Sequence, residues 1–375
     1  MNAMQVSARP ATRLHYLDNL RVFLTFLVVA HHVALAYGNL ESWPNWEPPA
    51  DPVLGLPLDL FVLLNQAFFM GLFFLLSGYL SPGSVDRKGS GTYALDRLKR
   101  LGIPFAAFVL LLRPIYTLPI YLDLPLAERP PYWRFYLTES NIGPMWFIEV
   151  LLIFSLIYAL LRRRTPGAPK SEPAPLRARQ VLVFAVVLAL VSYLWRIFVP
   201  VGTYVPVVGL PSAAHMPQYV MLFSAGILAY RRGWFQTLPR RTGLIGLAFV
   251  LGSLVPMAVG GYRTLDLAAA PSTTNLAHLG FALWESLFAA GVILILLRAF
   301  QRLGHRTTPV RRFLSQNAFA VYIVHAPVIV GVVALLHSLD QPPALKFLLG
   351  FVLAAPLSWS IAAGLRRIRA VRAVL

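Results

Sequence analysis

Cysteine is absent from the 375 residues of this chain. The absence excludes disulfides, iron–sulfur clusters and thiolate catalysis, and it leaves the redox compartment undetermined. Charged residues are scarce too, at 13%, whereas a soluble domain of this length carries about a quarter. Because this deficit runs through the whole length, the sequence leaves little room for a separate soluble domain.

Acidic residues are particularly few. The chain has 15 Asp and Glu against 33 Lys and Arg, a net charge of +18. A basic excess of this size is typical of nucleic-acid-binding proteins, but here the basic residues stand in short clusters between apolar runs. We therefore expect no nucleic-acid partner. The 57% hydrophobic content and the mean hydropathy of +0.64 point to the lipid bilayer instead.

Ten apolar runs approach the roughly 20 residues that one membrane crossing needs. We predict an all-α polytopic bundle that forms a single domain over residues 1–375, with a short tail at about 1–17 and a linker at about 162–179. A cleaved signal peptide is disfavoured because His31 and His32 stand in the middle of the first run. The spans are expected at about 19–37, 58–80, 102–121, 144–161, 180–199, 217–230 (a short one), 242–260, 278–297, 314–337 and 344–364.

The distribution of Lys and Arg predicts the orientation of these spans. With both termini on the cytoplasmic side, 26 of the 33 basic residues fall in cytoplasmic segments and only four fall in outer loops. Cytoplasmic loops of membrane proteins carry such an excess of positive charge. Adding or removing one span would destroy the asymmetry, so it supports the number of spans.

The first span holds the densest group of ionisable side chains: Asp18, Arg21, His31 and His32. Arg21 and His32 are eleven residues apart, close to three helical turns, so they share one face at a separation of about 16 Å. Asp18 lies one turn before Arg21, whereas His31 points about 100° away from that face. Ionisable residues inside spans are functional candidates by default. The alternative is that Arg21 reaches the interface and His32 makes an ordinary hydrogen bond between helices.

Four further segments stand out, and two of them belong to the second and third spans. Arg97 and Arg100 lie one turn apart, just before Gly102-Ile103-Pro104, which we expect to open the third span. They suit a polyphosphate, but ordinary cytoplasmic charge is the more frequent explanation of such a cluster. The small pair Ser77-Gly78, in the run FFLLSGYL, allows close helix packing.

Two later motifs carry polar groups at the other spans. In NIGPMWFIE (141–149), Trp146 suits a membrane interface and Glu149 lies one turn deeper, where it needs a partner. In NAFAVYIVHAP (317–327), Tyr322 and His325 lie one turn apart, and the alternative for His325 is a hydrogen-bonded core histidine. Opposite charges remain elsewhere in the spans and suggest pairing, but the sequence does not say which residues pair: Arg113, Arg196, His215, His278 and Glu285.

Taken together, these motifs resemble the motif series of acyltransferase family 3, the bacterial membrane O-acyltransferases. The resemblance covers the whole chain, and the stand-alone length is similar to the branch that includes glucan-biosynthesis protein C. The motifs are Asp18-x-x-Arg21, Arg21-x10-His32, FFLLSGYL (73–80), Arg97-x-x-Arg100 before a proline, GPMWFIEVLL (143–152) and VYIVHAP (321–327).

The resemblance implies transfer of an acyl group from cytoplasmic acyl-CoA to a hydroxyl of a carbohydrate or another envelope molecule. By analogy His32 is the essential catalytic group, with Arg21 and Asp18 beside it, and Arg97 and Arg100 hold the CoA phosphates. The donor is acetyl-CoA or succinyl-CoA, and no metal is required. Trp146, Glu149, Tyr322 and His325 remain candidates for the acceptor side.

Two other functions compete with this one. A transporter or flippase would use the same intramembrane charges as a substrate or proton path, and inverted halves with tandem charged spans would favour it. A membrane receptor or scaffold would need neither Arg21 and His32 on one face nor a basic pair at one end. The sequence leaves open the acyl group, the acceptor, an acyl-enzyme intermediate and a homo-oligomeric state.

Overall fold

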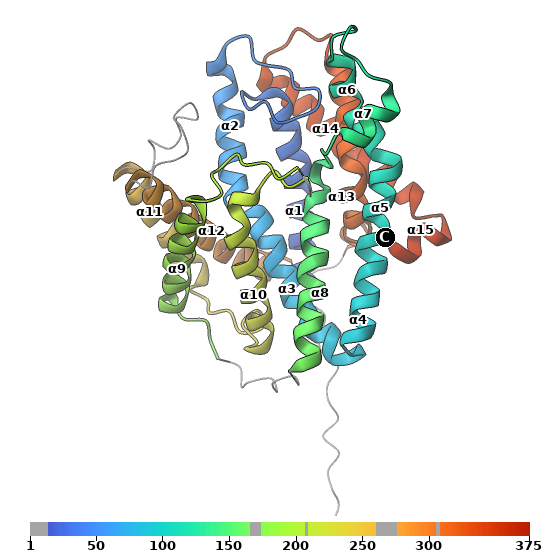
Figure 1. Cartoon of the computed structure of the whole chain (residues 1–375). Coiled ribbons are helices and arrows are strands. Elements are labelled where there is room, and N and C mark those ends of the chain that lie inside the picture. Colours follow the sequence, from blue (N-terminus) through green and yellow to red (C-terminus); the bar gives the residue numbers. More distant parts are fainter. Residues whose placement is uncertain (1–13, 166–173, 207–208, 260–275, 305–307) are drawn as a thin grey trace, which may run out of the picture.

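The computed structural model describes residues 14–165, 174–206, 209–259, 276–304 and 308–375. The described chain is helical, with a single isolated β-bridge between Val205 and Leu210 and no strand (Figure 1). Most of the expected tail and the middle of the expected linker lie outside the described residues. The same holds for Arg9, Arg13, Lys170, Arg263 and Arg306, which contributed to the charge count above.

The order of the helices follows the ten apolar runs. The helices are α1 His15–Tyr37, α2 Pro52–Gln66, α3 Phe69–Lys88, α4 Ser90–Arg97, α5 Ile103–Ala107, α6 Arg113–Asp123, α7 Tyr132–Thr138, α8 Trp146–Arg164, α9 Ala178–Arg196, α10 Met216–Arg231, α11 Thr242–Val259, α12 Leu276–Leu303, α13 Pro309–Leu336, α14 Pro343–Leu365 and α15 Arg369–Val374.

Nine helical segments of the described chain are long and apolar enough to cross a membrane. The remaining expected span, the sixth, corresponds to α10, which has 16 residues and a length of about 24 Å. The chain is therefore an all-α polytopic membrane protein. The prediction that the sixth span is short is confirmed.

The second and third spans differ in their boundaries from the expectation. The second span covers Pro52–Lys88 and consists of α2 and α3, which meet at Ala67 and Phe68. At this break the Gln218 side-chain amide of α10 donates to the Ala67 carbonyl over 2.7 Å. Another helix thus satisfies the freed backbone group, as a break inside a membrane requires.

The third span begins at Ser90 rather than at 102, so the prediction that Gly102-Ile103-Pro104 opens it is wrong. The helix continues through Pro104 because a π-helical turn, Leu98–Gly102, precedes it. Proline lacks an N–H and its ring clashes with the carbonyl four residues earlier in a regular helix. Widening of the helix at a π turn relieves both problems. Arg97 and Arg100 therefore lie within the helix.

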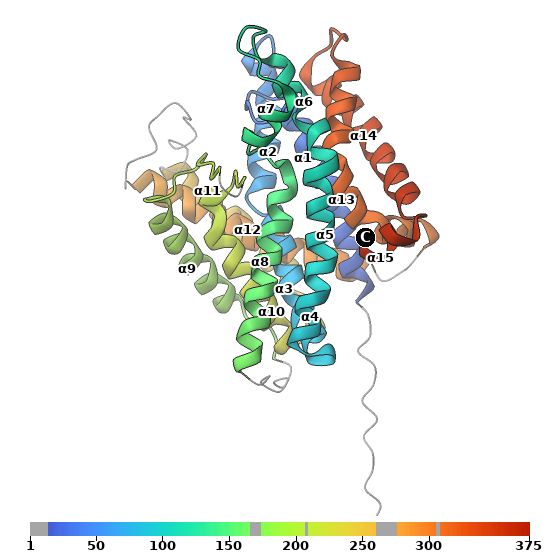
Figure 2. The ribbon, with the colours of Figure 1, turned by 45° about the vertical axis from the view of Figure 1, so that its right-hand side comes forward.

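Helix α1 lies inside the bundle and contacts α2, α12, α13 and α14, while α3 packs along α10 and α11 along α12 (Figure 2). The pair α3–α10 is the tightest, because a Cβ on Gly78 would lie 2.0 Å from the Phe223 carbonyl oxygen. A Cβ on Gly226 would likewise lie 2.1 Å from the Leu75 carbonyl oxygen. The expected role of Gly78 in close helix packing is confirmed.

The carboxyl ends of α3, α8 and α10 meet at one acidic residue, Asp86. Arg162 of α8 lies 3.0 Å from Asp86 Oδ1, and Arg231 of α10 lies 2.8 Å from Asp86 Oδ2. These ends form what we call the basic end of the bundle, which appears at the bottom of Figure 1.

Candidate active site

A cavity of about 270 Å³ opens between α1, α3, α4, α8 and α13. Three arginines line it: Arg21 from α1, and Arg97 and Arg100 from the segment around the π-helical turn. Tyr322 of α13 lines it as well. The structure thus brings together the basic pair, the arginine of the first span and one residue of the VYIVHAP motif, which are far apart in sequence.

Arg97 is held in position by an aromatic side chain. Its guanidinium carbon lies 4.9 Å from the centre of the Tyr93 ring, a cation–π arrangement. The Tyr93 hydroxyl is in turn 2.8 Å from Ser81 Oγ of α3. Arg100 is exposed. One arginine of the pair is therefore pre-oriented, and the other is free to move toward an anion.

His32 lies on the same stripe of α1 as the cavity-lining residues Arg21 and Thr25, two turns farther along. Its Nδ1 is 2.8 Å from the Val28 carbonyl oxygen and 3.3 Å from Nε2 of His325. The indole of Trp43 flanks the His32 ring at 5.1 Å between centroids. His32 itself is not among the lining residues of the cavity.

The hydrogen bonds fix the tautomers of both imidazoles. Nδ1 of His325 is 2.7 Å from the Tyr322 carbonyl oxygen, and a carbonyl only accepts, so this nitrogen carries the proton. The same reasoning places the proton of neutral His32 on Nδ1, facing Val28 O and His325 Nε2. The Nε2 of His32 then keeps its lone pair, and it makes no hydrogen bond with any part of the chain that the structure describes.

His31 faces a different group, as expected from its rotation about the helix. Its Nδ1 is 3.2 Å from the side-chain nitrogen of Asn65, and its ring lies 4.8 Å from that of Phe69. Because an amide nitrogen donates, Nδ1 of His31 is the acceptor and its proton is on Nε2. The two adjacent histidines therefore hold opposite tautomers and face different partners.

Tyr322 connects the cavity to the histidine pair. Its backbone carbonyl accepts from His325, and its hydroxyl donates to the Pro144 carbonyl oxygen. Pro144 belongs to the NIGPMWFIE motif, so the two late motifs meet at this residue. The His325 side chain is fully buried at 0% exposure.

Three other candidates lie away from the cavity lining. Trp146 is buried and stacks on Tyr219, with 5.5 Å between ring centroids, rather than lying at a membrane interface. Glu149 is half-buried on α8, and its carboxylate makes no hydrogen bond or ion pair within the described ranges. Asp18 is half-buried in the first turn of α1.

The structure adds polar lining residues that the sequence did not indicate. Ser77 was considered only for packing, yet it lines the cavity together with Ser315 and Gln316 of α13. A helical stripe was the available signal, because Phe73, Ser77 and Leu80 recur every three to four residues and all three face the cavity.

Three of the remaining intramembrane residues, Arg196, His215 and Glu285, form a buried group next to α9 and α12. Arg196 donates to Glu285 over 2.6 Å, and His215 lies 3.1 Å from the other carboxylate oxygen. Both members of the Arg196–Glu285 pair are almost fully buried. The expected pairing of opposite charges is thus found, with the partners now identified. No group of three metal-ligating side chains occurs in the described residues.

The comparison with protein families decides the class of protein. The model of the acyltransferase domain, acyltransferase family 3, matches residues 14–363. This chain belongs to that acyltransferase family. The match runs from the first described turn of α1 to the end of α14 and includes every motif described above.

Among curated proteins, this chain is similar to glucans biosynthesis protein C. The relative from Salmonella paratyphi A is 28% identical over 198 residues, which is 48% of this chain and 48% of the relative. The relative from Escherichia coli strain SMS-3-5 is 29% identical over 164 residues, or 41% and 40% of the two chains. The chain thus spans about half the length of the curated relatives it matches. No solved structure matches it. The acyltransferase is a multi-pass membrane protein, and its resemblance to family 3 is confirmed.

Proposed function

We propose that this acyltransferase moves an acyl group from acyl-CoA, acetyl-CoA or succinyl-CoA, to a hydroxyl of a carbohydrate or another cell-envelope acceptor. One observation supports this most strongly. Three arginines and Tyr322 line a single cavity, the Tyr322 carbonyl oxygen accepts from His325, and His325 contacts His32. In this proposal the arginines are the phosphate-binding group and His32 is the general base, with Tyr322 and His325 between them.

The arginines match the phosphates of CoA. Arg21, Arg97 and Arg100 present guanidinium groups, which bind phosphate oxygens in bidentate geometry. They lie toward the basic end, which the distribution of Lys and Arg predicts to be cytoplasmic, where acyl-CoA is found. On this basis both termini lie in the cytoplasm and the protein belongs to the bacterial inner membrane.

His32 is the general base of the proposed reaction. Its Nε2 lone pair accepts the proton of the acceptor hydroxyl while the oxygen attacks the thioester carbonyl carbon. The carbon–sulfur bond breaks, and the departing CoA thiolate takes the proton from the His32 imidazolium. Val28 O and His325 Nε2 hold the Nδ1 side of the ring, which stabilises the imidazolium between the two proton transfers.

The dimensions of α1 agree with this division of roles. Arg21 and His32 are separated by eleven residues, or about 16 Å along the helix. Since the phosphates and the thioester are at opposite ends of CoA, phosphate contacts at Arg21 leave the acyl end to extend along the helix toward His32. Trp43 and Tyr116, whose rings are 5.4 Å apart, lie beyond His32 on the side expected for the acceptor.

The first test is consumption of acetyl-CoA and succinyl-CoA by the purified, detergent-solubilised protein, with and without envelope glycan. We expect thioester loss with one donor and its near-abolition in His32→Ala, since general bases contribute about 10²–10⁴-fold. His31→Ala is the matched control, and it should be the milder variant because His31 faces Asn65.

Two results would overturn the proposal. Equal activity of His32→Ala and the unaltered protein would remove the assigned base. Absence of both thioester consumption and CoA binding, even with glycan present, would favour a transporter or flippase that uses the intramembrane charges.

A further inference from the structure

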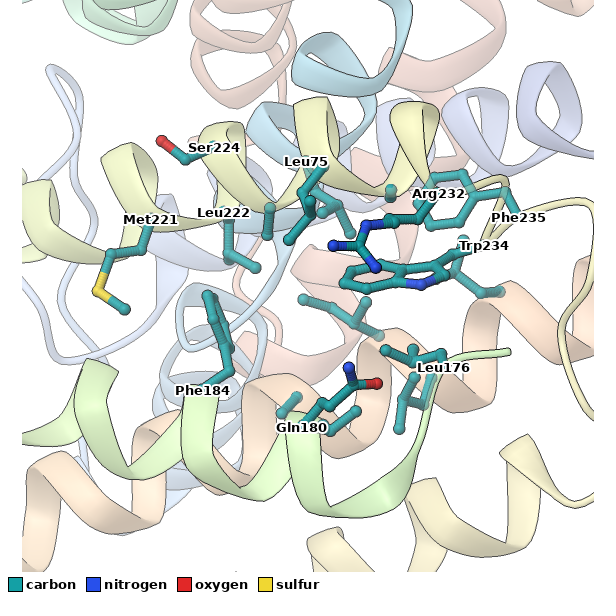
Figure 3. Close-up of a pocket in the computed structure, with 18 of the residues that line it drawn as sticks. Leu75, Leu176, Gln180, Phe184, Met221, Leu222, Ser224, Arg232, Trp234 and Phe235 are labelled. Atoms are coloured by element: carbon teal, nitrogen blue, oxygen red, sulfur yellow. The ribbon is translucent and has the colours of Figure 1, made fainter. Parts of the chain in front are cut away.

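A second cavity, of about 510 Å³, lies between α9, α10 and α12, and it shares no residue with the candidate active site. Its lining is almost entirely apolar and includes Phe184, Met221 and Leu294. Figure 3 shows Arg232 and Trp234 together at one end of this cavity and Phe184 and Met221 at the other. We call it the lateral groove.

The lateral groove has the length of one leaflet. From Met221 to Arg232, both in its lining, α10 and its last turn advance eleven residues, or about 16 Å. The hydrocarbon core of a bilayer is about 30 Å thick, so this distance is close to half of it. An apolar groove of that length, open on a membrane-embedded protein, fits a single lipid acyl chain.

At the polar end of the groove, Arg232 and the side-chain nitrogen of Gln180 offer hydrogen-bond donors. Arg232 is exposed and its guanidinium makes no hydrogen bond or ion pair with the described residues, whereas the adjacent Arg231 is paired with Asp86. Gln180 already uses its side-chain oxygen to accept from the Arg177 backbone, which leaves its amide N–H groups. The Arg232 guanidinium and the Gln180 amide N–H groups together match phosphate oxygens, which accept hydrogen bonds and carry negative charge.

Among the residues that the structure describes, the charge around this end is one-sided. Arg177 precedes α9 at the groove, Arg232 follows α10, and the acidic residue that lies near, Asp86, is occupied by Arg162 and Arg231. A headgroup with net negative charge is attracted here, and the ammonium of a zwitterionic headgroup is repelled. The end is also the basic end of the bundle, and Trp234 has the amphipathic ring typical of membrane interfaces.

We propose that the lateral groove binds one phospholipid with an anionic headgroup, its acyl chain along α10 and its phosphate at Arg232. The bound lipid would fill the back of α10, whose other side packs on α3 through Gly78 and Gly226. Since α3 supplies Leu76 and Ser77 to the candidate active site, the lipid supports one wall of that cavity. The proposal stands whether or not the acyl donor is CoA.

The test is native mass spectrometry of the full-length protein released from detergent and titrated with phosphatidylglycerol or phosphatidylcholine of the same acyl chains. We expect one phosphatidylglycerol to bind more tightly than phosphatidylcholine. Arg232→Gln should weaken phosphatidylglycerol binding about fivefold, the effect of one cation near the headgroup. Arg240→Gln, an exposed arginine eight positions later without a described partner, is the matched control and should not change binding.

A second variant tests the apolar part of the groove. Ala225→Trp should fill it and abolish binding of the first lipid, and Ser224→Trp, on an exposed lining position, serves if Ala225→Trp fails to fold. Equal binding of the two lipids, or unchanged binding in Arg232→Gln or in the folded tryptophan variant, would overturn the proposal. So would displacement of phosphatidylglycerol by palmitoyl-CoA but not by acetyl-CoA, because the groove would then belong to the acyl donor.

Discussion

His32 and His325 meet across 293 positions of sequence, and their hydrogen bonds define the chemistry of each ring. Each Nδ1 faces a backbone carbonyl, so the tautomers follow from groups that side-chain substitution does not change. His31, one position away, has the opposite tautomer because Asn65 donates to it. The Val28 carbonyl and the Asn65 side-chain amide thus give the neighbouring His32 and His31 different tautomers.

Replacement of His325 tests its role as a positioning residue. We expect His325→Leu to lower kcat about tenfold, the value of one hydrogen bond, and to leave KM for acyl-CoA unchanged. His325→Gln, which retains an acceptor, should recover part of the loss. A change in KM with an unaltered kcat in steady-state assays would contradict this role.

Replacement of the basic pair tests the donor site. The double variant Arg97→Gln with Arg100→Gln should raise KM for acyl-CoA at least tenfold, because two charge-assisted contacts to phosphate are lost. The dependence of KM on ionic strength should weaken in parallel. Arg163→Gln with Arg164→Gln, a basic pair at the end of α8 outside the cavity, is the control and should leave KM unchanged.

Among the helices, the contact of α3 with α10 is the closest and the least tolerant of added atoms. Gly78 and Gly226 let each backbone approach the other at a distance that excludes a Cβ. Membrane helices commonly associate through such small residues, because apolar burial alone does not drive association in lipid. The wall of the candidate active site that carries Ser77 depends on this packing.

A pair of glycine substitutions tests the close packing. Gly78→Ala places a methyl group 2.0 Å from a backbone oxygen and should lower stability by about 1–3 kcal/mol, as overpacking does. Gly252→Ala, on α11 with nothing within 4 Å of the added Cβ, should leave stability unchanged or raise it slightly. Thermal unfolding in one detergent measures both, and equal melting temperatures would contradict the packing argument.

Across the whole molecule, the buried ion pair between Arg196 and Glu285 links α9 to α12 outside the lining of the candidate active site. Arg196→Met should destabilise the protein by about 3–5 kcal/mol, because Glu285 is then a buried charge without its guanidinium. The double variant with Glu285→Gln should recover much of the loss. Unfolding measurements on the single and double variants form the required cycle, and no recovery in the double variant would argue against direct coupling.

The absence of cysteine makes the orientation of the molecule directly measurable. Ser42→Cys lies in the exposed loop after α1, and Thr165→Cys lies at the exposed end of α8. With both termini in the cytoplasm, a membrane-impermeant maleimide should label the first variant in intact spheroplasts and the second only after permeabilisation. The reverse pattern would invert the proposed topology.

The sequence by itself determined the helical class, the spans and the motif residues, because long apolar runs fold only as helices in a bilayer and period 3.6 fixes which residues share a face. It therefore placed Arg21 and His32 on one stripe and put Tyr322 one turn from His325. The predicted start of the third span at Gly102-Ile103-Pro104, by contrast, was wrong, because the helix continues through Pro104 after a π-helical turn.

Only the tertiary structure decided which spans touch. The contact of His32 with His325, the pairing of Arg196 with Glu285, the position of Ser77 on the cavity and the burial of Trp146 all depend on contacts between helices distant in sequence. The physical reason is that the spacing of apolar residues shows which face of each helix points inward but not which helix packs against that face. The neighbour is set by side-chain packing, close glycine contacts and hydrogen bonds across the bundle, which no single helix contains.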